Sequence, residues 1–348
     1  MSSVFSVPSG VRRNGWRGRT RIAGLVAAAL VAAAVVPTAL HLRSAGAAEY
    51  PGPGAVSGNV AVHDPSMVKG PDGTYLLAAT APGIALRTST DRTKFTYTGL
   101  AFPNGTATWT DEYTGTSNGN LWAPDLSYQN GKYYLYYSAS SFGKNKSAIF
   151  LATSTTGKPG SWTNQGKIYS TTTSSNHNAI DPNLVIDRSG KWYLSLGSFW
   201  TGIKMIELNP STGKRISSSS TVYSIASRAN STAIEAPAII YHAGYYYLFT
   251  SWDACCQGTS STYKIMVGRS KTITGPYKDR PGNLLTAGGG TQILGTHGTI
   301  VGPGGQSLIQ DGDGDVLVYH YYDGADNGVA KLGINRLTWD SSNWPAVS

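Results

Sequence analysis

A hairpin pattern occurs five times along the chain and limits its fold more than any other feature. Each copy has a polar residue near a proline, a short apolar run, a turn that contains glycine, and an aromatic run. The copies are HDPSMVKGPDGTYLLAAT from His63, WAPDLSYQNGKYYLYYSAS from Trp122, IDPNLVIDRSGKWYLSLGS from Ile180, EAPAIIYHAGYYYLFTSWD from Glu235 and HGTIVGPGGQSLIQDGDGDVLVYHYYD from His297. Apolar runs joined by Asn-Gly or Asp-Gly turns predict antiparallel hairpins.

The spacing of these copies predicts the architecture. Their polar first members are 54 to 62 residues apart: Asp64, Asp125, Asp181, Glu235 and, with His-Gly in place of the proline, His297. All-β repeats near 50 residues are typical of propellers with one sheet per blade. Five copies therefore predict an all-β, five-bladed β-propeller. In such a fold the innermost strands line the axis, so residues that open them converge on one place.

Residues 1–48 differ from the rest of the chain. VRRNGWRGRTR is basic, the apolar run IAGLVAAALVAAAVVPTAL follows, and small residues end the segment at SAGAAEY. This order predicts a secretory signal segment with cleavage near Ala47 or Ala48. The apolar run is long, which leaves an uncleaved membrane anchor as the alternative. Arg12-Arg13 suggests twin-arginine export, but the residues after the pair do not support it.

The charge of the chain belongs mainly to this leader. The formal net charge is +9, and six arginines and no acidic residue lie in residues 1–48. Residues 49–348, which we expect to be one catalytic propeller domain, therefore carry only +3. They contain no cluster of lysine and arginine that would indicate a nucleic-acid partner. No lasting membrane partner is expected once the leader has been removed.

The two cysteines of the chain, Cys255 and Cys256, are adjacent. They do not form the CxxC spacing of a metal site. In an exported protein they could form a vicinal disulfide, which would be strained because adjacent Cα atoms are about 3.8 Å apart. Two thiols packed as small hydrophobic groups are the alternative.

Three of the polar first members are acids near a proline: Asp64, Asp181 and Glu235. One Asp-Pro pair would indicate only a turn, but three acids at matching places of different blades indicate a site. A protonated carboxyl and an ionised carboxylate across a cleft suit glycoside hydrolysis. A third carboxylate can raise the pKa of the acid by like-charge repulsion.

Several segments resemble glycoside hydrolase family 43, and most closely its endo-1,5-α-L-arabinanases. They are VHDPS, NLWAPDL, NAIDPNLVID, GSFWTGIKMIEL, EAPAIIY and SWDACCQGTSSTYKIMVGRS, in the family's order, and the resemblance extends over nearly all of residues 49–348. The resemblance implies a five-bladed propeller and an inverting mechanism. It implies that Asp64 is the general base, Glu235 the general acid, and Asp181 the residue that tunes and orients the acid.

The resemblance also implies residues that bind the substrate and a metal ion. The substrate-contacting positions, beside Asp64 and Asp181, are Gly143, Asn178, Ser198, Phe199 and Trp200. His297 matches a histidine near the axis that helps to hold a metal, often calcium; a histidine hydrogen-bonded inside the axis is the alternative. DGDGD at residues 311–315 superficially resembles a calcium loop, but its place in the repeat predicts a hairpin turn.

These features together predict a secreted monomer that cleaves internal α-1,5 linkages of arabinan, a polysaccharide of pectin side chains. One alternative is an exo-acting α-L-arabinofuranosidase or β-xylosidase of the same fold. Another is a sugar-binding propeller without catalysis, which would not need all three acids.

Overall fold

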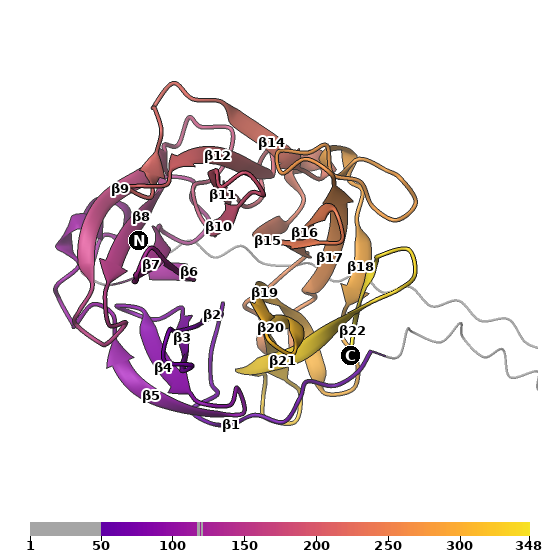
Figure 1. Ribbon diagram of the computed structural model, residues 1–348, viewed down its shortest axis with the longest axis horizontal. Coiled ribbons are helices and arrows are strands. Elements are labelled where there is room, and N and C mark those ends of the chain that lie inside the picture. Colours follow the sequence, from indigo (N-terminus) through magenta and orange to yellow (C-terminus); the bar gives the residue numbers. More distant parts are fainter. Residues whose placement is uncertain (1–49, 117–118, 120) are drawn as a thin grey trace, which may run out of the picture. The chain divides into compact units, whose positions relative to one another are not determined.

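The computed structural model describes residues 50–116, 119 and 121–348, and the predicted secretory segment, residues 1–48, lies outside the described residues. The described residues form 22 strands in five sheets. Figure 1 shows these sheets arranged in a ring around an axis, in the order of the sequence. The prediction of a five-bladed β-propeller is confirmed.

Each blade is one sheet whose strands follow one another from the axis outward, apart from the added strand β1 and the paired strands β13 and β14. Blade 1 has β2 (Ser66–Lys69), β3 (Tyr75–Ala79), β4 (Ala85–Ser89), β5 (Lys94–Leu100) and β1 (Ser57–Gly58). Blade 2 has β6 (Leu121–Gln129), β7 (Lys132–Ala139), β8 (Ser147–Ser154) and β9 (Thr163–Thr171). Blade 3 has β10 (Asn183–Ile186), β11 (Trp192–Leu196), β12 (Ile203–Asn209), β13 (Lys214–Arg215) and β14 (Val222–Ala226).

Blade 4 has β15 (Ile234–His242), β16 (Tyr245–Trp252), β17 (Lys264–Ser270) and β18 (Thr291–Leu294). Blade 5 has β19 (Ile300–Asp311), β20 (Gly314–Asp323), β21 (Val329–Trp339) and β22 (Pro345–Val347). Helical structure among the described residues is limited to α1 (Asp111–Thr114) and the 3-10 turns η1 (Thr108–Thr110), η2 (Ala229–Ser231), η3 (Gly258–Ser260) and η4 (Leu285–Ala287). No described helix is long and apolar enough to span a membrane.

The aromatic runs of the repeats form the second strand of each blade, which is buried on both faces. In β7, Leu135 and Tyr137 pack into the core shared with blade 1, while Tyr134 and Tyr136 pack into the core shared with blade 3. Consecutive side chains of a strand point to opposite faces, so an unbroken apolar and aromatic run suits a sheet covered on both sides. The core of the propeller therefore lies between the blades.

The predicted turns lie between the first two strands of their blades. Asn130 and Gly131 join β6 to β7 with φ values of 52° and 77°, as a tight turn with two left-handed residues requires. The DGDGD segment is the turn between β19 and β20, as predicted. Its Asp311 forms ion pairs with Lys69 and Arg92, each at 3.0 Å, so this carboxylate already has cationic partners.

The ring is closed by the first described residues. The Gly54 N–H donates to the Ile334 carbonyl (2.8 Å) and the Leu332 N–H donates to the Val60 carbonyl (2.9 Å), so this segment runs along β21 of blade 5. It then pairs as β1 in parallel with β5 of blade 1. The chain's last strand, β22, also pairs with β21. Both ends of the propeller thus meet on one strand.

Candidate active site

One residue near the start of each innermost strand has a left-handed backbone, and these five residues line one cavity. They are Asp64 (φ 45°), Ala123 (φ 45°), Asp181 (φ 55°), Ala236 (φ 50°) and Gly305 (φ 57°). Proline follows the first four, and Gln306 follows the fifth. A left-handed conformation costs a residue with a side chain about 1–3 kcal/mol. Its recurrence in every blade shows that the fold imposes it. We call these five residues the axial ring.

The predicted first members of the five repeats do not all occupy equivalent positions in the structure. Asp64 and Asp181 belong to it, but Glu235 lies one residue before it, Asp125 two residues after it, and His297 eight residues before it. The last repeat was matched at the wrong residue because it has no proline at the position of the axial ring. Its Gly-Gly-Gln run at residues 304–306 occupies the position that Asp-Pro or Ala-Pro occupies elsewhere.

Each N–H of the axial ring donates a hydrogen bond to a side chain of the preceding blade. The pairs are Ala123 to Thr80 Oγ1 (2.9 Å), Asp181 to Ser138 Oγ (2.9 Å), Ala236 to Asp181 Oδ2 (2.9 Å), Gly305 to Ser251 Oγ (2.9 Å) and Asp64 to His320 Nδ1 (3.1 Å). Four of these acceptors, Thr80, Ser138, Ser251 and His320, lie near or just beyond the end of the second strand of their blade. In blade 3 this place is held by Gly197, which has no side chain to accept, and the Asp181 carboxylate takes over. Asp181 is thereby fixed against the peptide that joins Glu235 to Ala236.

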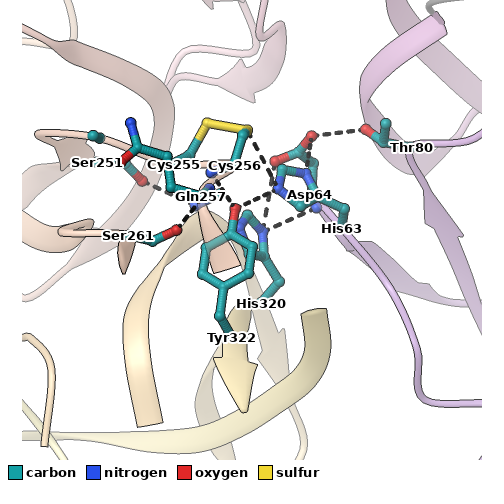
Figure 2. The surroundings of a disulfide bond; sticks show 12 residues. His63, Asp64, Thr80, Ser251, Cys255, Cys256, Gln257, Ser261, His320 and Tyr322 are labelled. Carbon is teal, nitrogen blue, oxygen red and sulfur yellow. Dashed lines mark hydrogen bonds and ion pairs between the residues drawn. A yellow bond between two sulfur atoms is a disulfide. The ribbon is translucent and has the colours of Figure 1, made fainter. Parts of the chain in front are cut away.

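Asp64 is held in its ionised form. Its Oδ2 accepts hydrogen bonds from Thr80 Oγ1 (2.7 Å) and lies 2.9 Å from His63 Nδ1 (Figure 2). Burial alone would raise the pKa of Asp64, but the charges and hydrogen bonds of His63, followed by His320 and Thr80, outweigh burial and hold the pKa well below its usual range. Asp64 is therefore a carboxylate near neutral pH.

The pKa values of Asp181 and Glu235 are shifted in the opposite direction, upward. Burial and then the negative charge of Asp64 raise the pKa of Asp181 to about 7. Burial, followed by the charges of Asp181 and Asp64, raises the pKa of Glu235 well above its ordinary value. Among the described residues, the Glu235 carboxyl has no hydrogen-bond partner, so its proton is not committed to a neighbour. The site thus combines an ionised carboxylate with a protonated carboxylic acid, which is the pair that general acid–base catalysis needs.

The predicted substrate-binding residues lie beside this site on connected loops. Asn178 is buried, and its Nδ2 donates to Ser198 Oγ (3.0 Å) and to the carbonyl of Lys144 (3.4 Å), next to Gly143. The Asn178 Oδ1 atom is buried without a partner in the described structure. The Phe199 N–H donates to the carbonyl of Ile234 (3.0 Å), which immediately precedes Glu235.

Phe199 and Trp200 form an exposed part of this region. Both have left-handed backbones, with φ values of 45° and 36°, and Phe199 is 40% exposed. Two successive left-handed residues with large side chains are strained, and strain of this kind clusters at binding sites. The buried Lys204 holds the loop by donating from Nζ to the Thr201 carbonyl (2.7 Å). An exposed aromatic ring at such a place offers a flat apolar face to a ligand.

His297 lies in the loop between β18 and β19, and its Nδ1 is 2.8 Å from the Gly295 carbonyl. Its ring contacts Tyr50, with ring centroids 5.7 Å apart, and it does not line the axial cavity. The one described cluster of three potential metal-ligating side chains is His63, Asp64 and His320, with ligand atoms within 4.8 Å of one another. The structure thus gives the axial position to His320 instead of His297.

His320 has a buried ring nitrogen that is available to bind a cation. Its side chain is fully buried, and its Nε2 has no hydrogen-bond partner in the described structure. Because Nδ1 accepts the Asp64 N–H, a neutral His320 carries its proton on Nε2. Ligation through Nε2 would need this proton on Nδ1 instead, so Nδ1 would give up the hydrogen bond from the Asp64 N–H and would face Asp64 Oδ1, 3.6 Å away, as a donor. His320 can therefore serve as a single nitrogen ligand, with water supplying the oxygen ligands that calcium prefers.

Apart from Asp181, the acceptors of the axial ring were not predicted from the sequence, and neither were the roles of His63 and Tyr322. A signal was present in the second strands of the repeats. Thr80, Ser138, Gly197, Ser251 and His320 occupy matching positions, and a comparison of these strands shows four polar residues and one glycine in otherwise apolar and aromatic runs.

Comparisons with known proteins identify the family. The model of glycosyl hydrolases family 43 matches residues 57–345. The chain belongs to glycosyl hydrolase family 43. An extracellular endo-α-(1→5)-L-arabinanase of Bacillus subtilis is 46% identical over 83% of this chain and 88% of its own length. An extracellular exo-α-(1→5)-L-arabinofuranosidase of Cellvibrio japonicus is 40% identical over 83% of this chain and 86% of its own.

The fold of this family 43 protein also matches a solved structure. The α-L-arabinanase of Cellvibrio cellulosa in complex with arabinohexaose has a TM-score of 0.79 and 38% identity, over 83% of this chain and 96% of that one. The resemblance drawn from the sequence motifs is confirmed, and the protein is a glycoside hydrolase.

Gly305→Ala is expected to damage the active site of this family 43 enzyme. A Cβ at residue 305 would lie 2.5 Å from Asp64 Oδ1 and 2.7 Å from the His320 ring, so the carboxylate must move. Gly190→Ala is the matched control, because Gly190 also has a positive φ (87°) but open space around its Cβ position. We expect kcat to fall at least tenfold for Gly305→Ala and to stay near wild type for Gly190→Ala. Equal kcat values for the two variants would contradict the close approach of Gly305 to Asp64.

Proposed function

We propose that the protein is a secreted endo-1,5-α-L-arabinanase that hydrolyses arabinan with inversion of configuration. The observation that carries the proposal is the opposite direction of two pKa shifts in one cluster, downward at Asp64 and upward at Glu235. Asp64 then acts as the general base that takes a proton from water, and Glu235 as the general acid that protonates the leaving oxygen. The endo-arabinanase of B. subtilis, at 46% identity, supports the substrate and the mode of cleavage.

Asp181 has two tasks in this mechanism. Its charge keeps the pKa of Glu235 high, so that the acid holds its proton until the leaving group departs. Its Oδ2 also accepts the N–H of Ala236 and so fixes the backbone that carries Glu235. The second task arises because Gly197 of blade 3 has no side chain. In the other four blades a side chain at this position accepts the N–H of the next axial-ring residue. Asn178, Ser198, Phe199 and Trp200, with Gly143 near them, would bind the sugar beside Glu235.

The test of this proposal uses debranched α-1,5-arabinan. Chromatography of the first products should show mixed short oligosaccharides. Proton NMR should show that the newly formed reducing end has the β configuration, opposite to that of the substrate. A first product of retained configuration would require a covalent intermediate and would contradict a base that acts through water. Inverting sites separate the two carboxyl groups by about 6.5–9.5 Å, which leaves room for that water.

An exo-acting enzyme is the second candidate, and a specific observation favours it. The exo-acting relative from C. japonicus is 40% identical over most of both chains, so the family motifs do not separate the two modes. Release of arabinose alone from the first minutes of reaction would support the exo mode. Linear arabinan with a blocked non-reducing end adds a direct control, because only an endo-acting enzyme cleaves it.

Secretion and a bound cation complete the proposal. Two relatives named as extracellular and the basic, apolar and small-residue order of residues 1–48 support export with cleavage near Ala48. Intact mass from culture supernatant should then correspond to a chain that begins near Glu49, and a mass that retains the arginine-rich leader would contradict cleavage. A calcium ion near the axis would be held by His320 and water, and would add positive charge that favours the ionised form of Asp64.

Asp181→Asn is expected to move the alkaline limb of the pH–rate profile to lower pH. The acid must be protonated, so the rate falls as pH rises through the pKa of the Asp181–Glu235 pair. Removal of the Asp181 charge makes ionisation of Glu235 easier, while the amide oxygen of Asn still accepts the Ala236 N–H. The kcat/KM profile measures the shift. Asp72→Asn, in the turn between β2 and β3, is the control and should leave the profile unchanged. If the alkaline limb of the Asp181→Asn profile does not move, Asp181 does not raise the pKa of Glu235.

A further inference from the structure

The two cysteines lie at the mouth of the site, close to the proposed base. Cys255 and Cys256 form a disulfide in the loop that follows β16. Figure 2 shows this disulfide beside the side chains of His63 and Tyr322, which come from blades 1 and 5. The Cys256 Sγ lies 3.8 Å from His63 Nε2. Three blades therefore meet at this point, and none of the roles assigned above uses the disulfide.

A chain of hydrogen bonds leads from the disulfide to Asp64. The Cys256 N–H donates to the Tyr322 hydroxyl (2.7 Å), this hydroxyl lies 2.8 Å from His63 Nε2, and His63 Nδ1 lies 2.9 Å from Asp64 Oδ2. A backbone N–H can only donate, so the Tyr322 oxygen accepts there and is free to donate its own proton to a neutral His63 at Nε2. The ring proton of His63 is then on Nδ1, facing Asp64. A cationic His63 also has a proton on Nδ1, so Asp64 receives this hydrogen bond in both charge states.

The donor at the start of this chain depends on an unusual backbone. Cys256 has a φ of 66°, a left-handed conformation that residues with side chains seldom adopt. The disulfide joins Cys256 to its neighbour in a small covalent ring, which restricts the backbone of both residues. The Cys256 side chain is exposed, so packing alone does not fix this position. The Tyr322 ring, in contrast, is buried, with less than a tenth of its surface exposed.

We propose that the Cys255–Cys256 disulfide, Tyr322 and His63 form a positioning system for Asp64. The disulfide holds the Cys256 N–H toward Tyr322, Tyr322 sets the position and tautomer of His63, and His63 orients the Asp64 carboxylate. Tyr322 and His63 are positioning residues, because they act through Asp64. This inference rests on the proposed role of Asp64 as the base. Partners that orient a functional group in this way typically affect activity about 10- to 100-fold.

Tyr322→Phe tests the middle of the chain, because it removes one oxygen and keeps the buried ring. We expect kcat to fall about 10- to 100-fold with KM nearly unchanged. The factor should be the same on arabinan and on an aryl arabinofuranoside with an acidic leaving group, because the base is needed for both. Tyr321→Phe is the matched control: it lies next along β20, and its hydroxyl has no hydrogen-bond partner among the described residues. It should keep wild-type kcat. Wild-type kcat in Tyr322→Phe would overturn the proposal.

Removal of the disulfide tests the start of the chain. Reduction with a phosphine, followed by intact mass, and the variant Cys255→Ser/Cys256→Ser should each lower kcat by the factor seen for Tyr322→Phe. Applied to Tyr322→Phe, the same treatments should cause no further loss, because both act through one path. Losses that multiply would overturn the proposal. Asp64→Asn assayed in parallel keeps the two hypotheses apart: an active Asp64→Asn would contradict the role of Asp64, whereas an inactive one with an unaffected Tyr322→Phe contradicts only the positioning system.

Discussion

Asp64→Asn is expected to be inactive on every arabinofuranoside, whatever its leaving group. Water is the nucleophile in an inverting reaction, and it needs a base to accept its proton in each turnover. The asparagine oxygen can still accept the Thr80 hydrogen bond, so the change removes charge and basicity with little change of shape. Rates on arabinan and on a dinitrophenyl arabinofuranoside provide the measurement, and both should fall by several orders of magnitude.

Asp125→Asn is the matched control for this variant. Asp125 is another buried carboxylate of an innermost strand, and it accepts the Leu184 N–H (2.8 Å) and the Asn183 side chain (3.1 Å). Burial raises the pKa of Asp125 to about 7 against these hydrogen bonds, and an amide oxygen can still accept the Leu184 N–H, although the hydrogen bond from Asn183 to the other oxygen is lost. We expect Asp125→Asn to retain activity. If Asp64→Asn instead loses activity only on arabinan, Asp64 is not the base.

Glu235→Gln is expected to separate substrates by their leaving groups. The alcohol released from arabinan needs a proton, so the variant should lose about 10²- to 10⁴-fold in kcat/KM on the polysaccharide. A dinitrophenolate departs without a proton, and the loss on its arabinofuranoside should be small. Glu207→Gln is the control, because Glu207 lies in blade 3 in an ion pair with Lys191 (3.6 Å) and should affect neither substrate. A loss of equal size on both substrates would contradict the role of Glu235 as the acid.

The repeats predicted the fold because each hairpin carries its own local signals. Asn130-Gly131 requires a tight turn, and the apolar runs on either side have the length of strands. The same signals failed where one blade departs from the pattern. In blade 5 the residues Gly304, Gly305 and Gln306 replace the proline motif, and the repeats could not be matched there by composition. The left-handed backbone of Gly305 is a property of the assembled ring, which local sequence does not reveal.

The acids of the candidate site were predicted from local sequence, whereas the residues around them were not. Asp64, Asp181 and Glu235 stand near prolines and could be found from the sequence, and the structure brings them together. The surroundings that set their protonation come from other blades. His320 is 256 residues from Asp64 in the sequence, and Tyr322 is 259 residues from His63. Hydrogen bonds over such separations follow from the closed ring, so no local pattern could have indicated them.

Closure on a single strand has a consequence for the order of biosynthesis. Residues 54–60 leave the ribosome long before their partners in β21, Leu332 and Ile334, which lie near the other end of the described propeller. The Asn335 amide binds the carbonyl of Gly52 (2.9 Å) and that of Ser348 (3.1 Å), so one side chain fastens both ends of the ring. A nascent chain therefore remains an open arc with unpaired edges until β21 has been made. The contacts of Asp64 with His320, and of His63 with Tyr322, need β20, so the surroundings of Asp64 cannot form before that strand exists.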